Sequence, residues 1–304
     1  MQAQVTFRFN AAAEVWRLMR NNARTLRRAA GPAAVLCAAL ALVACSETLG
    51  PLQGAPSKVA EVDADNPGAN AGNIASLTDV IQRNPGDSIA YNTRGIAYAK
   101  AGNYKSAIED FTKAVQIDPK FNAAYTNRAL AFRQMGKDGP ALADFNAAIA
   151  ANPNDASAYL GRGNLLRSQN HLPEAMADLD AAIRLNPEGA QAYHARGLIY
   201  QRLGNNEQAI TDFNNAIDRD PFAGAPYQAR GQSLVATGKY DQAVDDFDAA
   251  LNVDSNNAEA WAGLGLAYEK LGNKAKAVES YERATMVAPS NSAAKAGLLR
   301  LGAA

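Results

Sequence analysis

Side chains that commonly perform chemistry are few in this sequence and are not spaced for it. Nothing in the pattern places the two histidines, His171 and His194, beside a nucleophile. No group of cysteines and histidines has metal-ligand spacing, and no glycine-rich phosphate loop follows a strand. The acidic run at residues 245–248 has the register of a helix with a solvated face, not that of a calcium loop. The sequence therefore predicts that the protein is not an enzyme and has neither a cofactor nor a metal site.

One cysteine lies where a covalent modification is expected. An apolar run at residues 32–44 follows two arginines; it is short for a membrane span and typical of the core of a signal peptide. The run leads into residues 42–45, Leu-Val-Ala-Cys, which resemble the bacterial lipobox. That resemblance implies cleavage before Cys45 and transfer of a diacylglycerol to its thiol, with residues 1–44 as a lipoprotein signal peptide. An uncleaved anchor and cleavage at an ordinary signal-peptide site are the alternatives.

An acylated Cys45 would anchor the chain in the bacterial cell envelope. Ser46 favours the outer membrane under the sorting rule of well-studied Gram-negative bacteria, with the inner membrane as the alternative. Residues 45–72 are rich in Gly, Pro, Ala, Asn and Asp without an apolar period, which predicts a flexible linker. We therefore expect a periplasm-facing outer-membrane lipoprotein, whose translation starts at Met1 or Met19.

The charge distribution argues against a nucleic-acid partner. The formal net charge is +0, but residues 1–45 hold six arginines and a single acid. The rest of the chain is therefore mildly acidic, whereas proteins that bind nucleic acids present basic surfaces.

A period of 34 residues organises the rest of the chain. Proline recurs at this spacing from Pro85 to Pro289, with Ser255 in one of its places. The period defines six full units: 88–121, 122–155, 156–189, 190–223, 224–257 and 258–291.

Each position of the unit has a physical role in a pair of helices. A small residue in the first helix lets the two helices approach, and a glycine or asparagine ends that helix in the left-handed conformation. In the second helix, alanines and an aromatic residue or leucine form one apolar stripe, and the proline ends the unit. The small residues are Gly95, Ala129, Gly163, Gly197, Gly231 and Gly265; the helix-ending residues are Gly102, Gly136, Asn170, Gly204, Gly238 and Gly272.

These positions resemble those of the tetratricopeptide repeat (TPR) family over residues 88–291. The resemblance implies an all-α fold, a right-handed TPR α-solenoid of six helix-turn-helix repeats, within a domain at residues 73–302. Residues 73–83 and 292–301 are expected to be terminal capping helices, with Leu298 and Leu299 packed back on the array and Arg300 in water.

An arginine recurs in the first helix and an aspartate in the second, and both are lost together in the sixth unit, as Leu264 and Ser280. This paired loss predicts an Arg–Asp bridge that fixes helix packing; the alternative is a charged ladder that binds a ligand. The pairs are Arg94 with Asp110, Arg128 with Asp144, Arg162 with Asp178, Arg196 with Asp212, and Arg230 with Asp246.

The resemblance also implies a concave groove, lined by the first helices, that binds a protein or peptide partner. Its middle is basic with leucines between, which suits an extended peptide carrying acids and apolar anchors, or a C-terminal carboxylate. The alternative is that partners bind the convex face or the edges. The expected groove residues are Asn92, Ile96, Lys100, Leu130, Arg133, Leu160, Asn164, Arg167, His194, Leu198, Arg202, Gln228 and Gln232.

Together these features predict a non-enzymatic adaptor or scaffold that is anchored by lipid in the envelope. The architecture resembles outer-membrane TPR lipoproteins that bring envelope enzymes together. It resembles equally the pilotin lipoproteins, so a structural or assembly role in a secretion, pilus or barrel-assembly complex is the alternative. The sequence leaves the partner's identity and the oligomeric state open.

Overall fold

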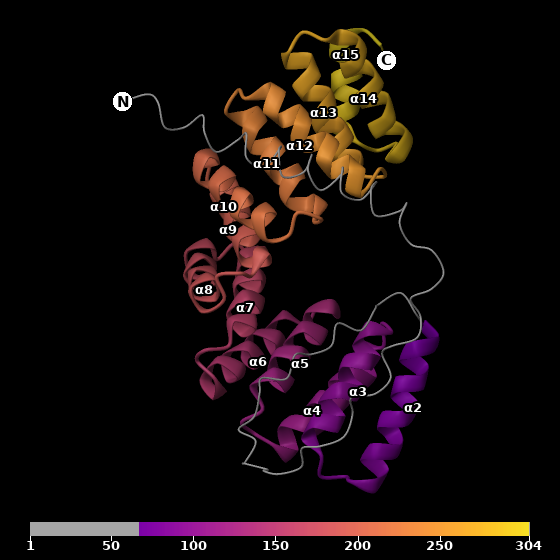
Figure 1. Cartoon of the computed structure of the whole chain (residues 1–304), viewed down its shortest axis with the longest axis vertical. Coiled ribbons are helices and arrows are strands. Elements are labelled where there is room, and N and C mark those ends of the chain that lie inside the picture. The colour runs from indigo at the N-terminus through magenta and orange to yellow at the C-terminus, as the bar shows by residue number, and fades with distance from the viewer. Residues whose placement is uncertain (1–66, 304) are drawn as a thin grey trace, which may run out of the picture. The chain divides into compact units, whose positions relative to one another are not determined.

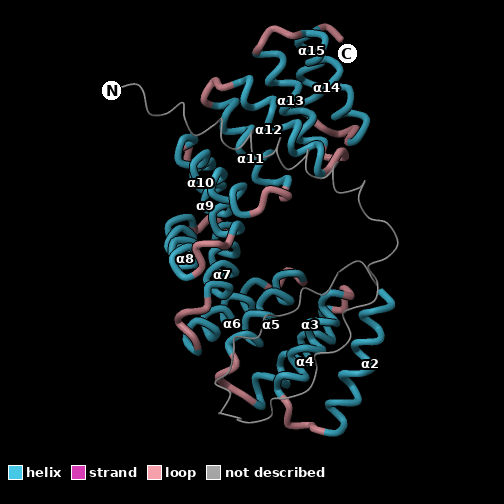
Figure 2. Tube along the Cα trace, viewed as in Figure 1, coloured by secondary structure: helices cyan, strands magenta, loops and turns pink. Residues whose placement is uncertain are grey.

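The computed structural model describes residues 67–303, which form fourteen α-helices and, within that range, no strand (Figure 1, Figure 2). Cys45, the expected signal peptide 1–44 and residues 45–66 of the expected linker lie outside the described residues. The helices are α2 (Pro67–Arg83), α3 (Ser88–Lys100), α4 (Tyr104–Ile117), α5 (Asn122–Gln134), α6 (Asp138–Ala151), α7 (Ala156–Ser168), α8 (Leu172–Leu185), α9 (Ala190–Arg202), α10 (Asn206–Arg219), α11 (Gly224–Ala236), α12 (Tyr240–Val253), α13 (Ala258–Lys270), α14 (Lys274–Val287) and α15 (Ser292–Leu301).

The helices confirm the predicted all-α repeat array. Each first helix begins at the first residue of its unit (α3, α5, α7, α9, α11 and α13), and the next helix in the chain packs against it as its pair. The helix α2 packs on the first pair and α15 on the last. The helix α2 begins at Pro67, ahead of the expected boundary at Asn73, so residues 67–72 of the expected linker are helical. Proline is favoured at a helix start because its missing N–H would be unpaired there.

The first helices end as the sequence predicts. Backbone φ is positive, between 65° and 77°, at all six helix-ending positions, and Asn170 is the one residue among them that is not glycine. The left-handed conformation lets the next N–H bond back into the helix; the N–H of Asn103, for example, donates to the carbonyl of Tyr98 at 2.9 Å. A Cβ atom is disfavoured in this conformation, which explains why the position is glycine in five of six repeats.

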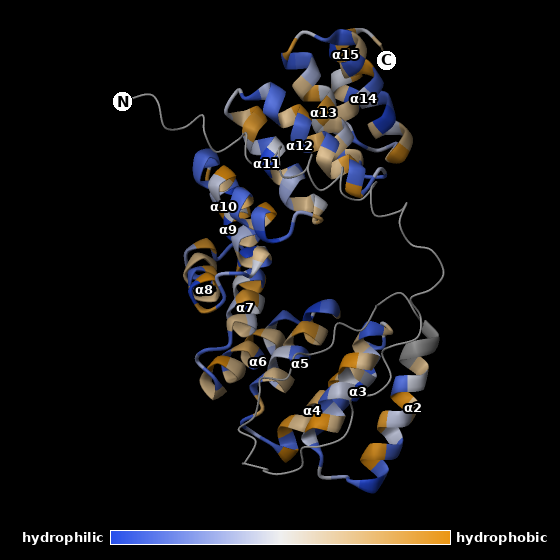
Figure 3. Ribbon diagram, in the orientation of Figure 1, coloured by the Kyte–Doolittle hydropathy of each residue, from blue (hydrophilic) through white to orange (hydrophobic). Residues whose placement is uncertain are grey.

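The core is a row of rings held against small residues. The rings of Phe111, Phe145, Phe213, Phe247 and Tyr281, one on each second helix except α8, are at most 1% exposed. A Cβ atom on Gly197 would lie 2.6 Å from Cε1 of Phe213 in the same repeat, so the glycine is required for this contact. The Phe247 ring lies against Gly231 of its own repeat and also against Gly263 of the next one. The Phe247 ring therefore joins successive repeats. Figure 3, coloured by hydropathy, shows apolar and polar residues alternating along the helices.

Successive first helices lie closer together than successive second helices. Each first helix has Cα atoms within 8 Å of the next first helix along the array. The series runs from α3 to α13, and α13 comes equally close to α15. No two successive second helices in residues 67–303 come this close. The first helices therefore line the inner side of the array, as the family resemblance implies. None of the described helices is long and apolar enough to cross a membrane.

The last helix, α15, covers the C-terminal end of the array only in part. Leu298 is buried, as expected, but Leu299 is 69% exposed, so the expectation that both leucines pack back is wrong for Leu299. Leu299 follows Gly265 by one period and stands at the small-residue position, where a second helix would pack in a complete repeat. No such helix follows in the described residues, so its side chain remains in solvent.

Replacement of Gly197 by leucine tests the ring contact. We expect the free energy of unfolding to fall by about 1–3 kcal/mol, because the new side chain must displace the Phe213 ring. Chemical denaturation would measure the loss, and hydrogen exchange should show it as weaker protection spreading from α9 and α10 to adjacent repeats. The matched control is Gly139→Leu in α6, since no atom lies within 4 Å of a Cβ at that position. Unchanged exchange in Gly197→Leu would contradict the proposed packing.

Candidate functional site

Five arginines on the first helices bind five buried aspartates on the paired second helices. In each pair, Nε and Nη2 of the arginine donate to the two carboxylate oxygens at 2.6–2.8 Å. The aspartates are 3–6% exposed. The bidentate hydrogen bonds raise the pKa of each arginine, and burial acts in the opposite direction. The predicted Arg–Asp bridges are therefore confirmed as structural.

Each bridging arginine also binds the second helix of the preceding repeat or, for Arg94, the capping helix α2. Its Nη1 donates, at 2.6–3.0 Å, to an oxygen on that helix, and its guanidinium lies over a tyrosine ring of its own helix at 5.6–5.9 Å. The sequence pattern did not predict this second hydrogen-bond partner, because the residue type at the acceptor position varies along the array. The acceptors are Thr78, Thr112, Asn146, Asp180 and Asn214.

The sixth repeat lacks the bridge, and Leu264 packs instead in the hydrophobic cluster that includes Phe247. Leu264 and Ser280 are both 3% exposed, and the Ser280 hydroxyl donates to the carbonyl of Lys276 within its own helix. The loss of both residues together leaves no buried charge without its counterion, which explains why they change as a pair.

Two expected groove residues serve contacts between repeats. Asn92 is buried, and its Oδ1 accepts a hydrogen bond from Nδ2 of Asn127 at 2.9 Å. Gln228 accepts one from Nδ2 of Asn257 at 2.6 Å. Three of the others are exposed, namely Leu130, Arg202 and Gln232, and the rest are half-buried: Ile96, Lys100, Arg133, Leu160, Asn164, Arg167, His194, Leu198.

The three arginines expected in the groove differ from the bridging arginines in that no acid of the described residues lies beside them. Arg133, Arg167 and Arg202 come from three successive first helices, α5, α7 and α9. No carboxylate within residues 67–303 lies within 4.0 Å of their guanidinium nitrogens. We call these three residues the basic groove site.

Arg167 is the centre of the basic groove site. Its Nε is buried, and no acceptor in the described part of the chain hydrogen-bonds to it. Burial lowers the pKa of Arg167, and the positive charges of Arg133 and Arg202 lower it further. Arg133 and Arg202 are therefore both near enough to Arg167 to disfavour its charged form.

His194 lies at the edge of this site. Its ring packs at 5.8 Å from the Phe213 ring, centroid to centroid. Burial, and then the charge of Arg167, lower the pKa of His194, so that the imidazole is neutral near pH 7. The site thus combines permanent cations with a neutral ring and has no base facing a nucleophile.

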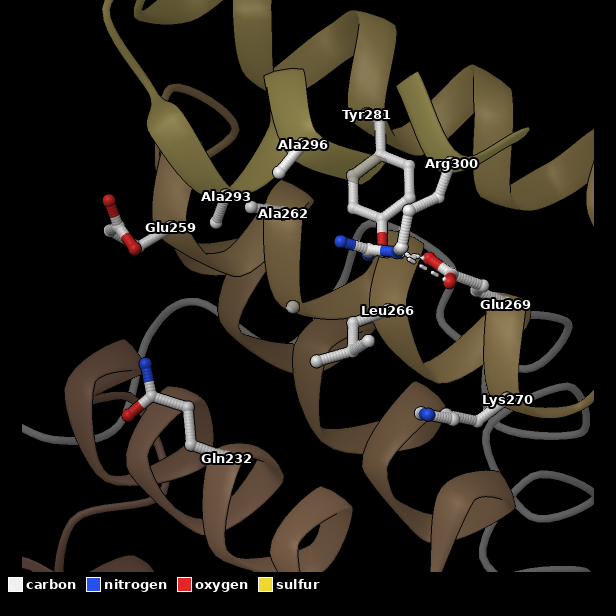
Figure 4. A pocket seen from close by; sticks show the side chains of 11 residues that line it. Gln232, Glu259, Ala262, Leu266, Glu269, Lys270, Tyr281, Ala293, Ala296 and Arg300 are labelled. Carbon is white, nitrogen blue, oxygen red and sulfur yellow. Dashed lines mark hydrogen bonds and ion pairs between the residues drawn. The ribbon is translucent and has the colours of Figure 1, made fainter. Parts of the chain in front are cut away.

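A cavity of about 390 Å³ lies at the C-terminal end of the same surface, between α11, α13 and α15 (Figure 4). Small residues of α13 and α15 line it, among them Ala262 and Ala296. On one side Glu269 accepts two hydrogen bonds from Arg300, at 2.8 and 2.9 Å, and one from the Tyr281 hydroxyl at 2.7 Å. Arg300 is exposed, as expected, and it also pairs with Glu269, because the carboxylate on the adjacent first helix is within reach. Tyr281 reaches the same carboxylate because it carries a hydroxyl where most other repeats have phenylalanine.

The charges of this network reinforce one another. The hydrogen bonds from Arg300 are the main cause that lowers the pKa of Glu269. Burial, with the bond to Glu269, raises the pKa of Tyr281. The negative charge of Glu269 is therefore already compensated by Arg300, so this carboxylate is not free to bind a cation. In residues 67–303 no group of three or more His, Cys, Asp or Glu side chains could hold a metal ion.

Comparison with known families identifies the repeat. Models described as tetratricopeptide repeat or TPR repeat match residues 88–121, 123–155, 163–204, 190–222 and 229–294. These matches reach all six units that the 34-residue period defines. A search of the curated proteins finds no match to this sequence.

Solved structures share the fold at low sequence identity. A chain of the APC/C hetero-tetramer Cut9-Hcn1 is 20% identical with a TM-score of 0.68; 76% of the present chain is matched, and it spans only 46% of that longer chain. PilF of Pseudomonas aeruginosa is 20% identical over 70% of this chain and 97% of its own, with a TM-score of 0.65. PilW, described as a type IV pilus biogenesis factor, is 19% identical over 69% and 98%, with a TM-score of 0.62.

Replacing one arginine of each kind by methionine should separate structural from functional arginines. Arg162→Met leaves Asp178 buried without its counterion and should lower the free energy of unfolding by about 3 kcal/mol. Arg167→Met removes an unpaired cation from a half-buried position and should raise it by about 0.5–2 kcal/mol. Denaturant titration of the two variants measures both changes. Equal destabilisation by the two substitutions would show that Arg167 has a structural partner after all.

Proposed function

This chain belongs to the tetratricopeptide repeat family, and from that premise we propose that it is a non-enzymatic adaptor that binds polypeptide partners along its first helices. TPR proteins are typically scaffolds of this kind, which bind other proteins or peptides on extended concave surfaces. We propose further that the adaptor is anchored by lipid at Cys45 in the outer membrane of a bacterial envelope and faces the periplasm.

The observation that carries the binding proposal is the contrast between two sets of arginines. The five bridging arginines have all three donor nitrogens occupied by the protein. The basic groove site, on the inner side of the same array, has no acid of residues 67–303 beside it and includes a buried Nε to which no acceptor in that range hydrogen-bonds. A cation held in this way is costly to the folded state unless a ligand supplies the counterion. The inner face between α5 and α9 is therefore the part of the surface best suited to a partner.

The envelope proposal is supported by the sequence at residues 32–45, which combines an apolar run with a lipobox-like ending. Lipidation with more than one acyl chain would give a stable anchor, and the linker would let the array reach partners away from the membrane.

The alternative proposal is a structural or assembly component, pilotin-like, of a secretion, pilus or barrel-assembly complex. The array shares its fold with PilW, described as a type IV pilus biogenesis factor, over nearly the whole of that chain. Purification of the full chain from solubilised envelopes would separate the two roles. Co-purified cell-wall hydrolases or a protease favour the adaptor, whereas secretin or barrel subunits favour the assembly role.

The anchor is tested by Cys45→Ala. We expect the variant to lose incorporation of labelled palmitate and to accumulate as unprocessed precursor, because the thiol that accepts the lipid is gone. Mass spectrometry of the wild-type N-terminus should find Cys45 as the first residue, carrying the acyl chains. Equal labelling of the variant, or a mature N-terminus elsewhere, would contradict the proposal.

The groove is tested by reversing its charge. Changing Arg133, Arg167 and Arg202 together to glutamate should abolish partner capture from solubilised envelopes, because like charges would then face the ligand. The packing residues are untouched, so the variant should remain folded by circular dichroism. The matched control changes Lys105, Lys113 and Arg184, three exposed cations on the second helices, to glutamate. Partner capture that is lost in the control and kept in the groove variant would assign binding to the convex face.

A further inference from the structure

The repeats provide an internal comparison at the position that Arg133 and Arg167 share. Residues one period apart in this column are Ala99, Arg133, Arg167, Gln201, Val235 and Glu269. In the sixth repeat, Glu269 binds Arg300, which comes from the next first helix, α15. The counterion of a charge in this column is therefore placed on the following first helix.

The second and third repeats lack this counterion. The residues that correspond to Arg300 are Asn164 for Arg133 and Leu198 for Arg167, and neither is an acid. In the fourth repeat the column holds Gln201, whose Nε2 donates to the carbonyl of Ala229 and the hydroxyl of Ser233. Within the described residues, polar groups in this column are thus satisfied in the fourth and sixth repeats and left open in the second and third.

We propose that Arg133, Arg167 and Arg202 bind the side-chain carboxylates of an extended acidic segment of a partner protein. The inference rests on the proposed function, because the segment would lie in the same groove. A guanidinium offers a carboxylate two parallel hydrogen bonds, which is the arrangement that each bridging arginine already makes with aspartate in this protein. A carboxylate that accepts from the two Nη atoms of Arg167 would then supply the counterion that this arginine lacks within residues 67–303.

The side chains next to these arginines indicate which other residues the bound segment should carry. Leu130, Asn164 and Leu198 are one period apart on successive first helices. Leu130 and Asn164 lie one helical turn before Arg133 and Arg167. Its amide can donate to and accept from a peptide backbone, and the two leucines offer apolar contacts on either side. The bound segment should therefore carry apolar residues next to its acids.

The repeat spacing limits the distance between the acids. Packed helices are about 8–10 Å apart, and an extended chain advances about 3.3 Å per residue. Carboxylates on two adjacent arginines should therefore come from residues about three apart in the partner. A phosphate-rich polymer would meet the same cations, but the acidic remainder of the chain opposes a long polyanion.

Binding of a defined peptide to the full chain in detergent tests the inference. The probe is a fluorescent peptide of about twelve residues with two aspartates three residues apart, flanked by leucines. The control probe has asparagines in place of the aspartates. We expect anisotropy to show at least tenfold weaker binding of the asparagine peptide, and at least tenfold weaker binding of the aspartate peptide to Arg133→Gln and to Arg167→Gln. Arg184→Gln, on the outer side, should bind like the wild type.

A second readout reports from inside the site. A carboxylate beside Arg167 offsets its positive charge, so the aspartate peptide should raise the pKa of His194, as followed by NMR. The asparagine peptide should not, and in Arg167→Gln the aspartate peptide should cause no such rise.

Several outcomes would overturn the inference. Equal affinity for the two peptides would do so, as would unchanged binding by both arginine variants. Tighter binding of single-stranded DNA than of the aspartate peptide would also overturn it. The proposed function has a separate test in Leu130→Asp and Leu198→Asp, which alter the groove and leave the arginines in place. Loss of partner capture in these variants, with normal capture in the arginine variants, would end the carboxylate inference and leave the groove as the binding surface.

Discussion

The guanidinium of the bridging arginine is the group on which the geometry of this array depends. Two of its nitrogens bind the aspartate of the paired helix and the third binds the second helix of the preceding repeat, so one side chain fixes three helices. A buried ion pair contributes little net stability, because desolvation offsets the attraction. Its bidentate geometry, however, is satisfied in one arrangement only. The apolar rings drive the association of the helices, and the arginines select how the helices are arranged.

This division of roles makes the basic groove site interpretable. A lone exposed arginine would carry little information, since many surface cations have no partner. Here five arginines on the same helices show what a satisfied guanidinium looks like in this protein, and Glu269 with Arg300 shows how a charge in the groove column is compensated. Arg167 departs from both, with a buried Nε and two like charges nearby. Among these arginines, Arg167 is therefore the one whose surroundings are best suited to an external counterion.

The features predictable from the sequence are those that repeat at identical positions. Helix bounds, the left-handed turns and the Arg–Asp pairs all follow from columns in which one residue type recurs. The third hydrogen bond of the arginines did not, because threonine, asparagine and aspartate alternate at the acceptor position and no column is visible. The burial of Asn92 and the pairing of Arg300 were missed for a related reason: each depends on a neighbour that occurs once, Asn127 or Glu269. Cys45 lies outside the described residues, so its lipidation stays a prediction from sequence.

The exposed leucine at the end of α15 has a consequence for how such a chain can change in length. Duplication or deletion of an internal unit would join a second helix to a first helix at the 34-residue period, so the small-residue positions and the ring positions would stay in register. Addition of a unit after α15 would not, because Leu299 occupies the place where the incoming ring needs a glycine or alanine. Growth at this terminus would require that leucine to be replaced first. A change in repeat number from within the array is therefore compatible with its packing, whereas a repeat packed on α15 is not while Leu299 is present.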